Sequence, residues 1–517
     1  MLSKNLLAAL CSLILGILFV TNAFAADYYI SPAGNDSNPG TEAQPWQSIA
    51  KVNDADLEPA DTVLFEGGKT FTGTITLDKN DAGTSDKKVT ITSFGIGRAI
   101  INGGNGSALT AEGTDYLVVK NINFIGSGRK TGNTEGGVIV SDANGAEIDH
   151  IAVSGFQKSG LSARGVHNIR ITNVYAHDNG ADGIGVGASK TGWSQNVYIG
   201  HCVAENNPGD PTNLTNHSGS GIVVGELSNC LIEYCEAMNN GWDMPRRGNG
   251  PVGIWTWSAD KVIIQFCIAH DNKSPGHDGG GFDIDGGVTN SILQYNLSYN
   301  NEGPGYFLCQ YPTATAFKNN IIRYNISQDD GTKNNRKSAI DIYGGDVGMS
   351  DCQIYNNTIY IKNGAPIGFG GIEAPGFVIS NNIFIFGGEL ISGDFKTGRF
   401  ENNVYWRVDD RDLLFYGHKT IDEWAQATGQ EKIGDTVVGK YIDPKLIKPG
   451  TANLTDPTKL ATLDAYKILP DSPCVGAGLE IKDNGGRDLW GTRLPEAAKL
   501  TIGACEKHKC PLEQQKK

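Results

Sequence analysis

The chain has 517 residues, a formal net charge of −14 at neutral pH and an isoelectric point of about 5.1. This acidic balance argues against nucleic acid as a partner, because binding to nucleic acid usually needs a basic face. Glycine is abundant at 68 residues, and Ala, Leu and Glu are not enriched. This composition favours many short strands joined by tight turns.

Residues 1–25 have the pattern of a secretory signal peptide. Lys4 supplies the positive start, Leu6 to Val20 the apolar stretch, and Ala23-Phe24-Ala25 the cleavage site. The apolar stretch is too short for a membrane span, and no second one reaches membrane length. We therefore expect a secreted or periplasmic protein that begins near Ala26 and has no membrane span. We also expect it to be a monomer.

Internal repetition is the strongest feature of the chain. The repeated segments are NVYAHDN (from Asn173), HCVAENN (from His201), YCEAMNN (from Tyr234), FCIAHDN (from Phe266), YNLSYNN (from Tyr295) and YNISQDD (from Tyr324). Two equivalent series result, namely Cys202, Cys235, Cys267, Asn296 and Asn325, and Asn179, Asn207, Asn240, Asn272, Asn301 and Asp330. A unit of roughly 30 residues with only short strands buries its apolar face by stacking on the next unit.

These repeats predict an all-β fold, a right-handed parallel β-helix solenoid over residues 89–406. Residues 26–88 are expected to form an N-terminal cap and the first strands. Residues 407–517 are expected to form a capping region that packs on the solenoid and covers its open end, with one short helix at 422–430. The cysteines should be buried without disulfides, and the asparagine amides should bond from coil to coil. Cys505 and Cys510 are the one pair for which a disulfide stays open.

A second strand in each repeat indicates which residues face outward. The strands are GLSAR (from Gly160), GIGVG (from Gly183), GIVVG (from Gly221), GIWTW (from Gly253), GFDID (from Gly281), GYFLC (from Gly305) and AIDIY (from Ala339). Their second and fourth residues are nearly all apolar and should point inward, so the third and fifth should point outward. The outward residues of the first three strands are mostly small. Those of the last four are Trp255, Trp257, Asp283, Asp285, Phe307, Cys309, Asp341 and Tyr343.

The upper part of this outward row is the predicted site. We expect Trp255, Trp257, Phe307 and Tyr343 to bind sugar rings, with packing beneath a loop as the alternative for the tryptophans. Long polar loops precede these strands and should form a basic wall. Its residues are His217, Arg246, Arg247, His277, Lys333, Arg336 and Lys337, with solvated loop charges as the alternative for the last three. Arginines beside a sugar groove suit carboxylates or sulfates on the sugar.

The chain resembles the pectin-lyase-like superfold of secreted carbohydrate-active β-helix proteins. The resemblance includes the opening YYISPAGNDSNPGTEAQPWQSIAKV (from Tyr28) and the closing DSPCVGAG (from Asp471), RDLWGTR (from Arg487) and IGACE (from Ile502). It implies a polysaccharide or oligosaccharide as the partner. The fold hosts many activities, so it does not choose among them.

Elimination is the leading prediction for the reaction. A base would remove the proton α to a uronate carboxylate, and the group on the β carbon would leave. His277 would be the base, and Arg246 or Arg247 would hold the carboxylate. No cofactor is otherwise predicted, but Ca²⁺ held by Asp278, Asp283 and Asp285 could replace the arginine.

Hydrolysis is the close alternative. An inverting glycoside hydrolase needs two carboxyl groups about 6.5–9.5 Å apart. Asp283 and Asp285 lie two residues apart on one strand, and Asp283 and Asp341 lie two coils apart, so both pairs qualify before the side chains are placed. A non-catalytic glycan-binding β-helix is the third interpretation, against which the cluster at His277 counts.

One group of calcium-dependent β-helix pectate lyases is similar in outline. Its D-D-G-F-D segment corresponds to GGGFD (from Gly279), and its G-N-G-F-K segment to GPGYF (from Gly303). Asp283 matches the closing aspartate. The two leading aspartates are Gly279 and Gly280, and Phe307 stands in place of the catalytic lysine. The metal site and base of that group are therefore not carried over.

Overall fold

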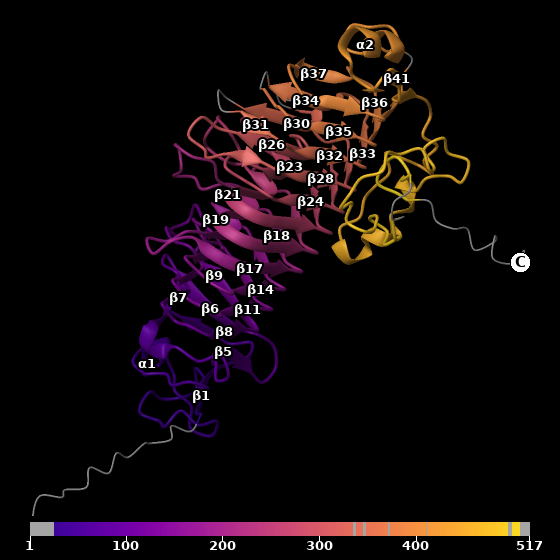
Figure 1. The fold of residues 1–517 in the computed structure, drawn as a ribbon. Helices are drawn as coiled ribbons and strands as arrows, with labels where there is room; N and C mark the ends of the chain where they lie inside the picture. Colours follow the sequence, from indigo (N-terminus) through magenta and orange to yellow (C-terminus); the bar gives the residue numbers. More distant parts are fainter. Residues whose placement is uncertain are drawn as a thin grey trace, which may run out of the picture.

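The protein forms a long parallel β-helix in a computed structural model that describes residues 25–333, 338–344, 348–370, 373–409, 411–494 and 499–506. Each coil contributes strands to three faces, and equivalent strands pair in parallel from coil to coil (Figure 1). The predicted signal peptide, Cys510 and the segment that contains Arg336 and Lys337 lie outside the described residues.

The first face carries the predicted site. Its strands are β4 (Ile75–Leu77), β7 (Leu109–Glu112), β10 (Val138–Ser141), β13 (Leu161–Arg164), β16 (Asp182–Gly187), β19 (Ser220–Glu233), β21 (Val252–Gln265), β23 (Gly280–Ile284), β26 (Tyr306–Gln310), β30 (Ser338–Gly344), β34 (Ala365–Gly370) and β37 (Ile391–Asp394).

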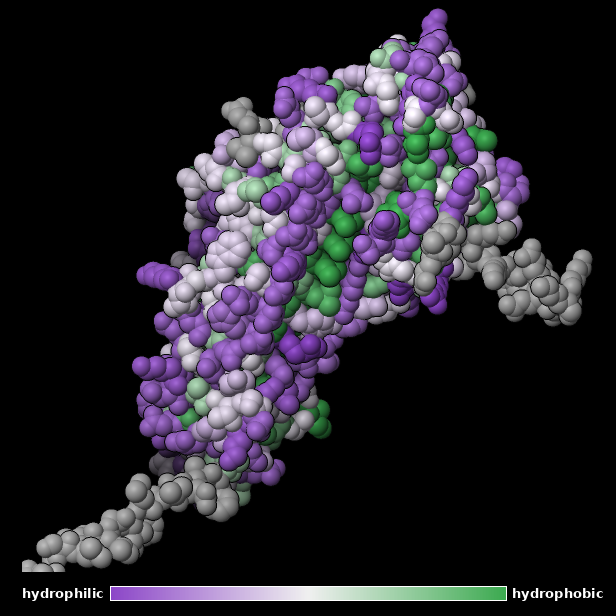
Figure 2. Space-filling model, viewed as in Figure 1, coloured by the Kyte–Doolittle hydropathy of each residue, from purple (hydrophilic) through white to green (hydrophobic). Residues whose placement is uncertain are grey.

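The second face is joined to the first by β19 and β21, which run through both. Its other strands are β1 (Asp27–Ile30), β2 (Thr62–Glu66), β5 (Val89–Phe94), β8 (Leu117–Lys120), β11 (Glu147–Asp149), β14 (Arg170–Thr172), β17 (Ser194–Gly200), β24 (Ile292–Gln294), β28 (Ile321–Arg323), β32 (Gln353–Tyr355), β35 (Val378–Ser380) and β38 (Arg399–Glu401). A band of hydrophobic residues lies on this face near β24, beside the C-terminal region (Figure 2).

The third face closes each coil. Its strands are β3 (Thr70–Thr72), β6 (Ala99–Gly104), β9 (Ile122–Gly126), β12 (Ala152–Ser154), β15 (Tyr175–His177), β18 (Val203–Glu205), β20 (Glu236–Met238), β22 (Ile268–His270), β25 (Leu297–Tyr299), β29 (Ile326–Gln328), β33 (Thr358–Ile361), β36 (Ile383–Phe386), β39 (Val404–Arg407) and β42 (Lys440–Tyr441). Two short pairs, β27 (Phe317–Lys318) with β31 (Met349–Ser350) and β40 (Lys432–Ile433) with β41 (Thr436–Val437), complete the strands of the described chain.

Parallel stacking of strands begins earlier in the chain than the predicted start of the solenoid at residue 89. β1 pairs with β2, and β2 with β5, so the second face already starts at Asp27 rather than at residue 89. The apolar alternation of the cap is interrupted by loops and by helix α1 (Ile49–Asn53). These interruptions hide the coil period in the sequence.

The interior of the coils contains the two predicted ladders. The Asn179 side chain donates to Asn207, Asn207 to Asn240, Asn240 to Asn272, Asn272 to Asn301 and Asn301 to Asp330, at 2.8–3.1 Å. The second series continues upward as Asn296, Asn325, Asn357, Asn382, Asn403 and Glu431. Below it, Cys202, Cys235 and Cys267 are buried free thiols, as predicted. Each ladder ends on a carboxylic acid.

The C-terminal region covers both the end and a flank of the solenoid. Helix α2 (Ile421–Thr428) matches the predicted helix, and its Trp424 packs on Phe400 at the open end. The following segment folds back along the coils, where the side chains of Gln328 and Tyr299 bond to the backbone of Ala452 and Leu454. The flank contact goes beyond the predicted end cap.

Candidate functional site

A cavity of about 310 Å³ opens on the outer side of the first face, and we call it the upper cavity. Its walls combine acidic, aromatic and basic side chains from strands and loops. They are Asn216, His217, Arg246, Asn249, Gly250, Val252, Trp255, Trp257, Asp278, Asp283, Asp285, Cys309, Gln310, Tyr311 and Tyr343.

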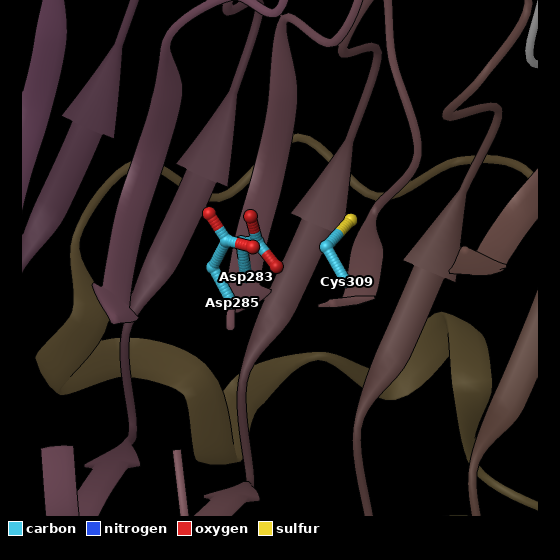
Figure 3. Close-up of side chains that lie close together, drawn as sticks. All are labelled: Asp283, Asp285 and Cys309. Atoms are coloured by element: carbon cyan, nitrogen blue, oxygen red, sulfur yellow. The ribbon is translucent and has the colours of Figure 1, made fainter. Parts of the chain in front are cut away.

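Strand β23 places two carboxylates in this cavity. Phe282 and Ile284 fill the core, and the alternation turns Asp283 and Asp285 to the outer side, as the sequence predicted. Asp283 lies deep, with 6% of its surface exposed, and Asp285 is half-buried next to it. Figure 3 shows the two carboxylates side by side and Cys309 on the neighbouring strand. One carboxylate oxygen of each aspartate and the Cys309 Sγ all lie within 4.8 Å of one another.

The glycines before β23 allow the chain to turn closely against its neighbours. Gly279 has a φ of 77°, in the left-handed region that favours glycine. A Cβ at Gly280 would lie 2.4 Å from the Phe307 ring. The turn holds Asp278 at the cavity, where its carboxylate accepts a hydrogen bond of 2.9 Å from the Gly250 backbone.

The structure places two predicted catalytic residues of the loops, His277 and Arg247, outside the upper cavity. His277 is half-buried, its backbone NH donates to Gly248, and its side chain does not line the upper cavity. Arg247 is exposed and also lies outside the lining. Arg246 does line it, and its Nη1 donates to the Asn249 carbonyl at 2.8 Å. Among the residues predicted as the base or as carboxylate binders, only Arg246 therefore lines the same cavity as the aspartates.

The predicted aromatic floor is less exposed than expected. Trp255 is 4% exposed, because it packs against Val252 and Phe307 and donates from Nε1 to Ser220. Phe307 is 1% exposed and does not reach the cavity. For these two residues the prediction of an open stacking surface was wrong, because side chains of neighbouring coils pack against both and the loop residue His217 packs against Trp255. Trp257 is half-buried and Tyr343 is 41% exposed, so these two offer ring faces to a ligand.

Asp341 is the third predicted acid on this row. It lies two coils above Asp283, with Phe307 between them in register. Its carboxylate is buried and accepts a hydrogen bond of 3.2 Å from Ser338. Asp341 does not line the upper cavity, so it is not grouped with Asp283 as the sequence allowed.

His217 belongs to the site but was assigned only to the loop wall. Its ring packs edge-on against Trp255 at 4.9 Å between centroids. Burial, together with the Arg246 charge, lowers the pKa of His217 to about 4, so the ring is neutral at pH 7. Its Nδ1 is buried and has no hydrogen-bond partner in the described chain. No sequence pattern indicates this burial, since a loop histidine is usually solvated.

The cluster of Asp283, Asp285 and Cys309 does not suit the calcium site considered above. Calcium takes six to eight oxygen ligands, whereas this cluster offers two carboxylates and a sulfur. Asp278, the third predicted ligand, is not part of the cluster among the described residues. We therefore derive no step through a metal.

A β-helix with carboxylates and aromatic rings in one outer cavity is the arrangement found in carbohydrate-active β-helix proteins. A family model for the Pel9A-like right-handed β-helix region matches residues 28–339. The chain belongs to this family, and the match confirms the predicted right-handed solenoid. In the described residues, no helix has the length and apolar character needed to cross a membrane.

Similar proteins include both hydrolytic and eliminating enzymes. The lacto-N-biosidase of Bifidobacterium longum is 28% identical over 198 residues, which cover 31% of this chain and 12% of that protein. The chain thus corresponds to a small part of this relative. Among solved structures, XylC in complex with xylose is 13% identical over 93% of this chain and 98% of the other, with a TM-score of 0.51. The pectate lyase Pel9A is 16% identical over 93% and 96%, with a TM-score of 0.46. At its identity the XylC structure shows the fold alone.

Proposed function

We propose that the protein is an exported glycoside hydrolase that cleaves an oligosaccharide or polysaccharide in the upper cavity. The observation that carries the proposal is the convergence of the Asp283 and Asp285 carboxylates in a cavity with Trp257 and Tyr343. Aspartate is disfavoured in the middle of a strand, yet Asp283 within β23 and Asp285 just after it both turn to the outer side and line the cavity. The lacto-N-biosidase similarity supports the same reaction class.

The spacing of the carboxylates favours a retaining mechanism over the inverting one considered from the sequence. Inverting enzymes separate their carboxyl groups by about 6.5–9.5 Å and retaining enzymes by about 5–5.5 Å. An oxygen of Asp283 and an oxygen of Asp285 lie within 4.8 Å of each other, a close approach that the retaining geometry accommodates, and we propose the retaining mechanism on this basis.

The two aspartates then have distinct roles. We assign the acid role to Asp283, the deeper of the two, which donates its proton to the leaving glycosidic oxygen. Asp285 attacks the anomeric carbon and forms a covalent glycosyl ester as the bond to the leaving group breaks. Asp283 then removes a proton from water, whose oxygen attacks the anomeric carbon and releases Asp285.

Elimination is the second candidate, and His217 is the observation that favours it. A neutral imidazole beside the Arg246 guanidinium combines a base with a partner for a uronate carboxylate. In this reaction His217 would take the α proton, Arg246 would stabilise the enolate-like intermediate, and the β substituent would leave. His217 thus replaces His277 as the base to test.

One assay separates the two reactions. The mature protein is incubated with neutral and uronate-containing oligosaccharides, while reducing ends and absorbance near about 235 nm are followed. Hydrolysis predicts new reducing ends without the absorbance, and elimination predicts both. The Asp285→Asn variant controls for a contaminating enzyme. Absence of cleavage on all glycans would overturn the proposal in favour of a binding protein.

Export is proposed from residues 1–25 and is tested separately. Expression in a Gram-negative host followed by N-terminal sequencing should give a chain that begins near Ala26. We also propose that the protein acts as a monomer, which size-exclusion chromatography with light scattering measures directly. A mature protein that retains Met1 would contradict export.

A further inference from the structure

A second cavity, of about 500 Å³, continues along the first face toward the N-terminal coils. We call it the lower cavity. It shares Asn216, His217 and Trp257 with the upper cavity, so the two are neighbouring parts of one groove. The sequence places mostly small side chains on the outward positions of these lower coils, and a binding site was not expected there.

The Arg164 side chain lies over a glycine at one of these small positions. It ends strand β13, in register with Gly187 of the next coil. A Cβ at Gly187 would lie 2.5 Å from Arg164 Nη1, so the guanidinium rests on the glycine. Its Nε donates to Ser162 at 3.3 Å. Among the described residues, Arg164 has no carboxylate oxygen within the 4.0 Å of an ion pair.

The other charges in the lower cavity have partners of their own. Lys158 pairs with the buried Asp210 at 2.5 Å. Asp182 accepts a hydrogen bond of 3.0 Å from Ser159; burial raises the pKa of Asp182 to about 6, and the nearby Arg164 charge acts in the opposite direction. Glu135 also lines the cavity. Among the described residues, Arg164 is therefore the cation of this cavity that faces a carboxyl group without forming an ion pair.

The Trp257 side chain, which comes from the coil above, lies over the next glycine of the row. Gly225 is in register with Trp257, and a Cβ at Gly225 would lie 2.2 Å from the indole Nε1. Gly187 and Gly225 belong to adjacent coils, next to the paired Val186 and Val224. The Arg164 guanidinium therefore lies over Gly187, and the Trp257 indole lies over Gly225. We call this pair of covered glycines, with the two side chains on them, the platform.

We propose that this platform binds an acidic sugar unit, with the sugar carboxylate on the Arg164 guanidinium and the sugar ring against Trp257. A planar guanidinium suits a carboxylate because it donates two parallel hydrogen bonds. Asp285 follows Ile284, which is in register with Thr256, so Asp285 lies one coil above Trp257. Arg164 then lies four coils below Asp285, about 19 Å along the stack. The inference rests on the proposed function only in treating the Asp285 end as the reacting end. The substrate class is then an oligosaccharide with a uronate unit away from the cleaved bond.

Binding of matched acidic and neutral probes tests the platform. The probes are tetrasaccharides of galacturonate, mannuronate and glucuronate, each with its methyl ester, titrated by calorimetry into the Asp285→Asn protein. Addition of Arg164→Gln should weaken binding of at least one acid about tenfold to hundredfold and leave its ester unchanged. Gly187→Ala should have the same selectivity, because it displaces the guanidinium and keeps the charge. Arg170→Gln, at an exposed arginine on β14, is the matched control and should have no effect.

Each outcome bears on one proposal. Equal affinity of the Arg164→Gln and parent proteins for every acid, or no binding of any acid, would overturn the platform and leave hydrolysis untouched. An equal loss for acid and ester would also overturn it, since the carboxylate would then not be recognised. Arg164-dependent binding of an acid that the natural protein does not cleave would support the platform and count against hydrolysis.

Discussion

The interior asparagine ladders and the outer row of the first face follow the same coil repeat in opposite ways. In the ladder from Asn179 to Asp330, each coil repeats the same side chain, and each amide bonds to the one above. On the outer row, successive coils place Arg164, Gly187, Gly225, Trp257 and Asp285 at one position. Repetition therefore marks residues that hold coils together, and its interruption marks residues that meet a ligand.

Removal of the outer carboxylates should have the largest effect on activity and little effect on stability. We expect Asp283→Asn and Asp285→Asn each to lower kcat by a factor of about 10²–10⁴, with the melting temperature nearly unchanged. Steady-state kinetics with circular dichroism melting measures both. Asp341→Asn is the matched control, because Asp341 lies on the same row outside the upper cavity. A large loss of stability with retained activity would reverse the comparison.

Removal of an interior amide should do the opposite. Asn240 is fully buried and bonds with Asn207, Asn272 and Ala204. Asn240→Ala leaves several buried groups unsatisfied, so we expect a loss of about 3–5 kcal/mol in the free energy of unfolding. Chemical denaturation measures it, and the exposed Gln195→Ala should change it by less than about 0.5 kcal/mol. A loss equal to that of Gln195→Ala would show that the ladder does not stabilise the coils.

The acid at the end of the ladder should make stability depend on pH. Burial raises the pKa of Asp330 from 3.8 to about 7, so the folded state holds the proton more tightly than the unfolded state. This stabilising contribution is fully present below about pH 4 and is lost as the pH rises through about 7.

The measurement is the melting temperature between pH 5 and 8. Asp330→Asn should reduce the fall in melting temperature across this range by a few degrees, because its amide does not ionise. Asp435→Asn, at an exposed site, should leave the fall unchanged. An unchanged pH dependence in Asp330→Asn would mean that Asp330 is already ionised in the folded protein.

The smallest effect is expected at His277. Its side chain lies outside the upper cavity, so His277→Ala should change kcat/KM by no more than about twofold. His217→Ala is the informative partner, because His217 lines the cavity and packs on Trp255. Kinetics on the same substrate compares them. If His277→Ala abolished activity, the loop would have to close further over the cavity than the structure shows.

The sequence predicted those features of the fold that follow from the coil repeat. The strands, the inward residues Phe282 and Ile284, both ladders and the outward direction of Asp283 and Asp285 follow from a period that the chain displays openly. The start of the solenoid at Asp27 did not follow, because the first coils are interrupted by loops.

The site was predicted only in part, because packing by loops and by neighbouring coils decides which outward residues meet solvent. No period in the sequence says that neighbouring coils bury Trp255 and Phe307 or that a loop brings His217 to the cavity. The lower cavity was missed for a related reason. In the sequence, a glycine indicates a position without a side chain. In the structure, side chains from neighbouring coils lie over Gly187 and Gly225.

The most direct test of the central claim is a crystal structure of the Asp285→Asn protein with the oligosaccharide that the natural protein cleaves. We expect sugar units along the first face, with the glycosidic bond to be cleaved beside Asp283 and position 285. The chain should continue past Trp257 toward Arg164. Sugar bound instead on the second or third face, or against the C-terminal region, would contradict the assignment of the interrupted outer row as the site of chemistry.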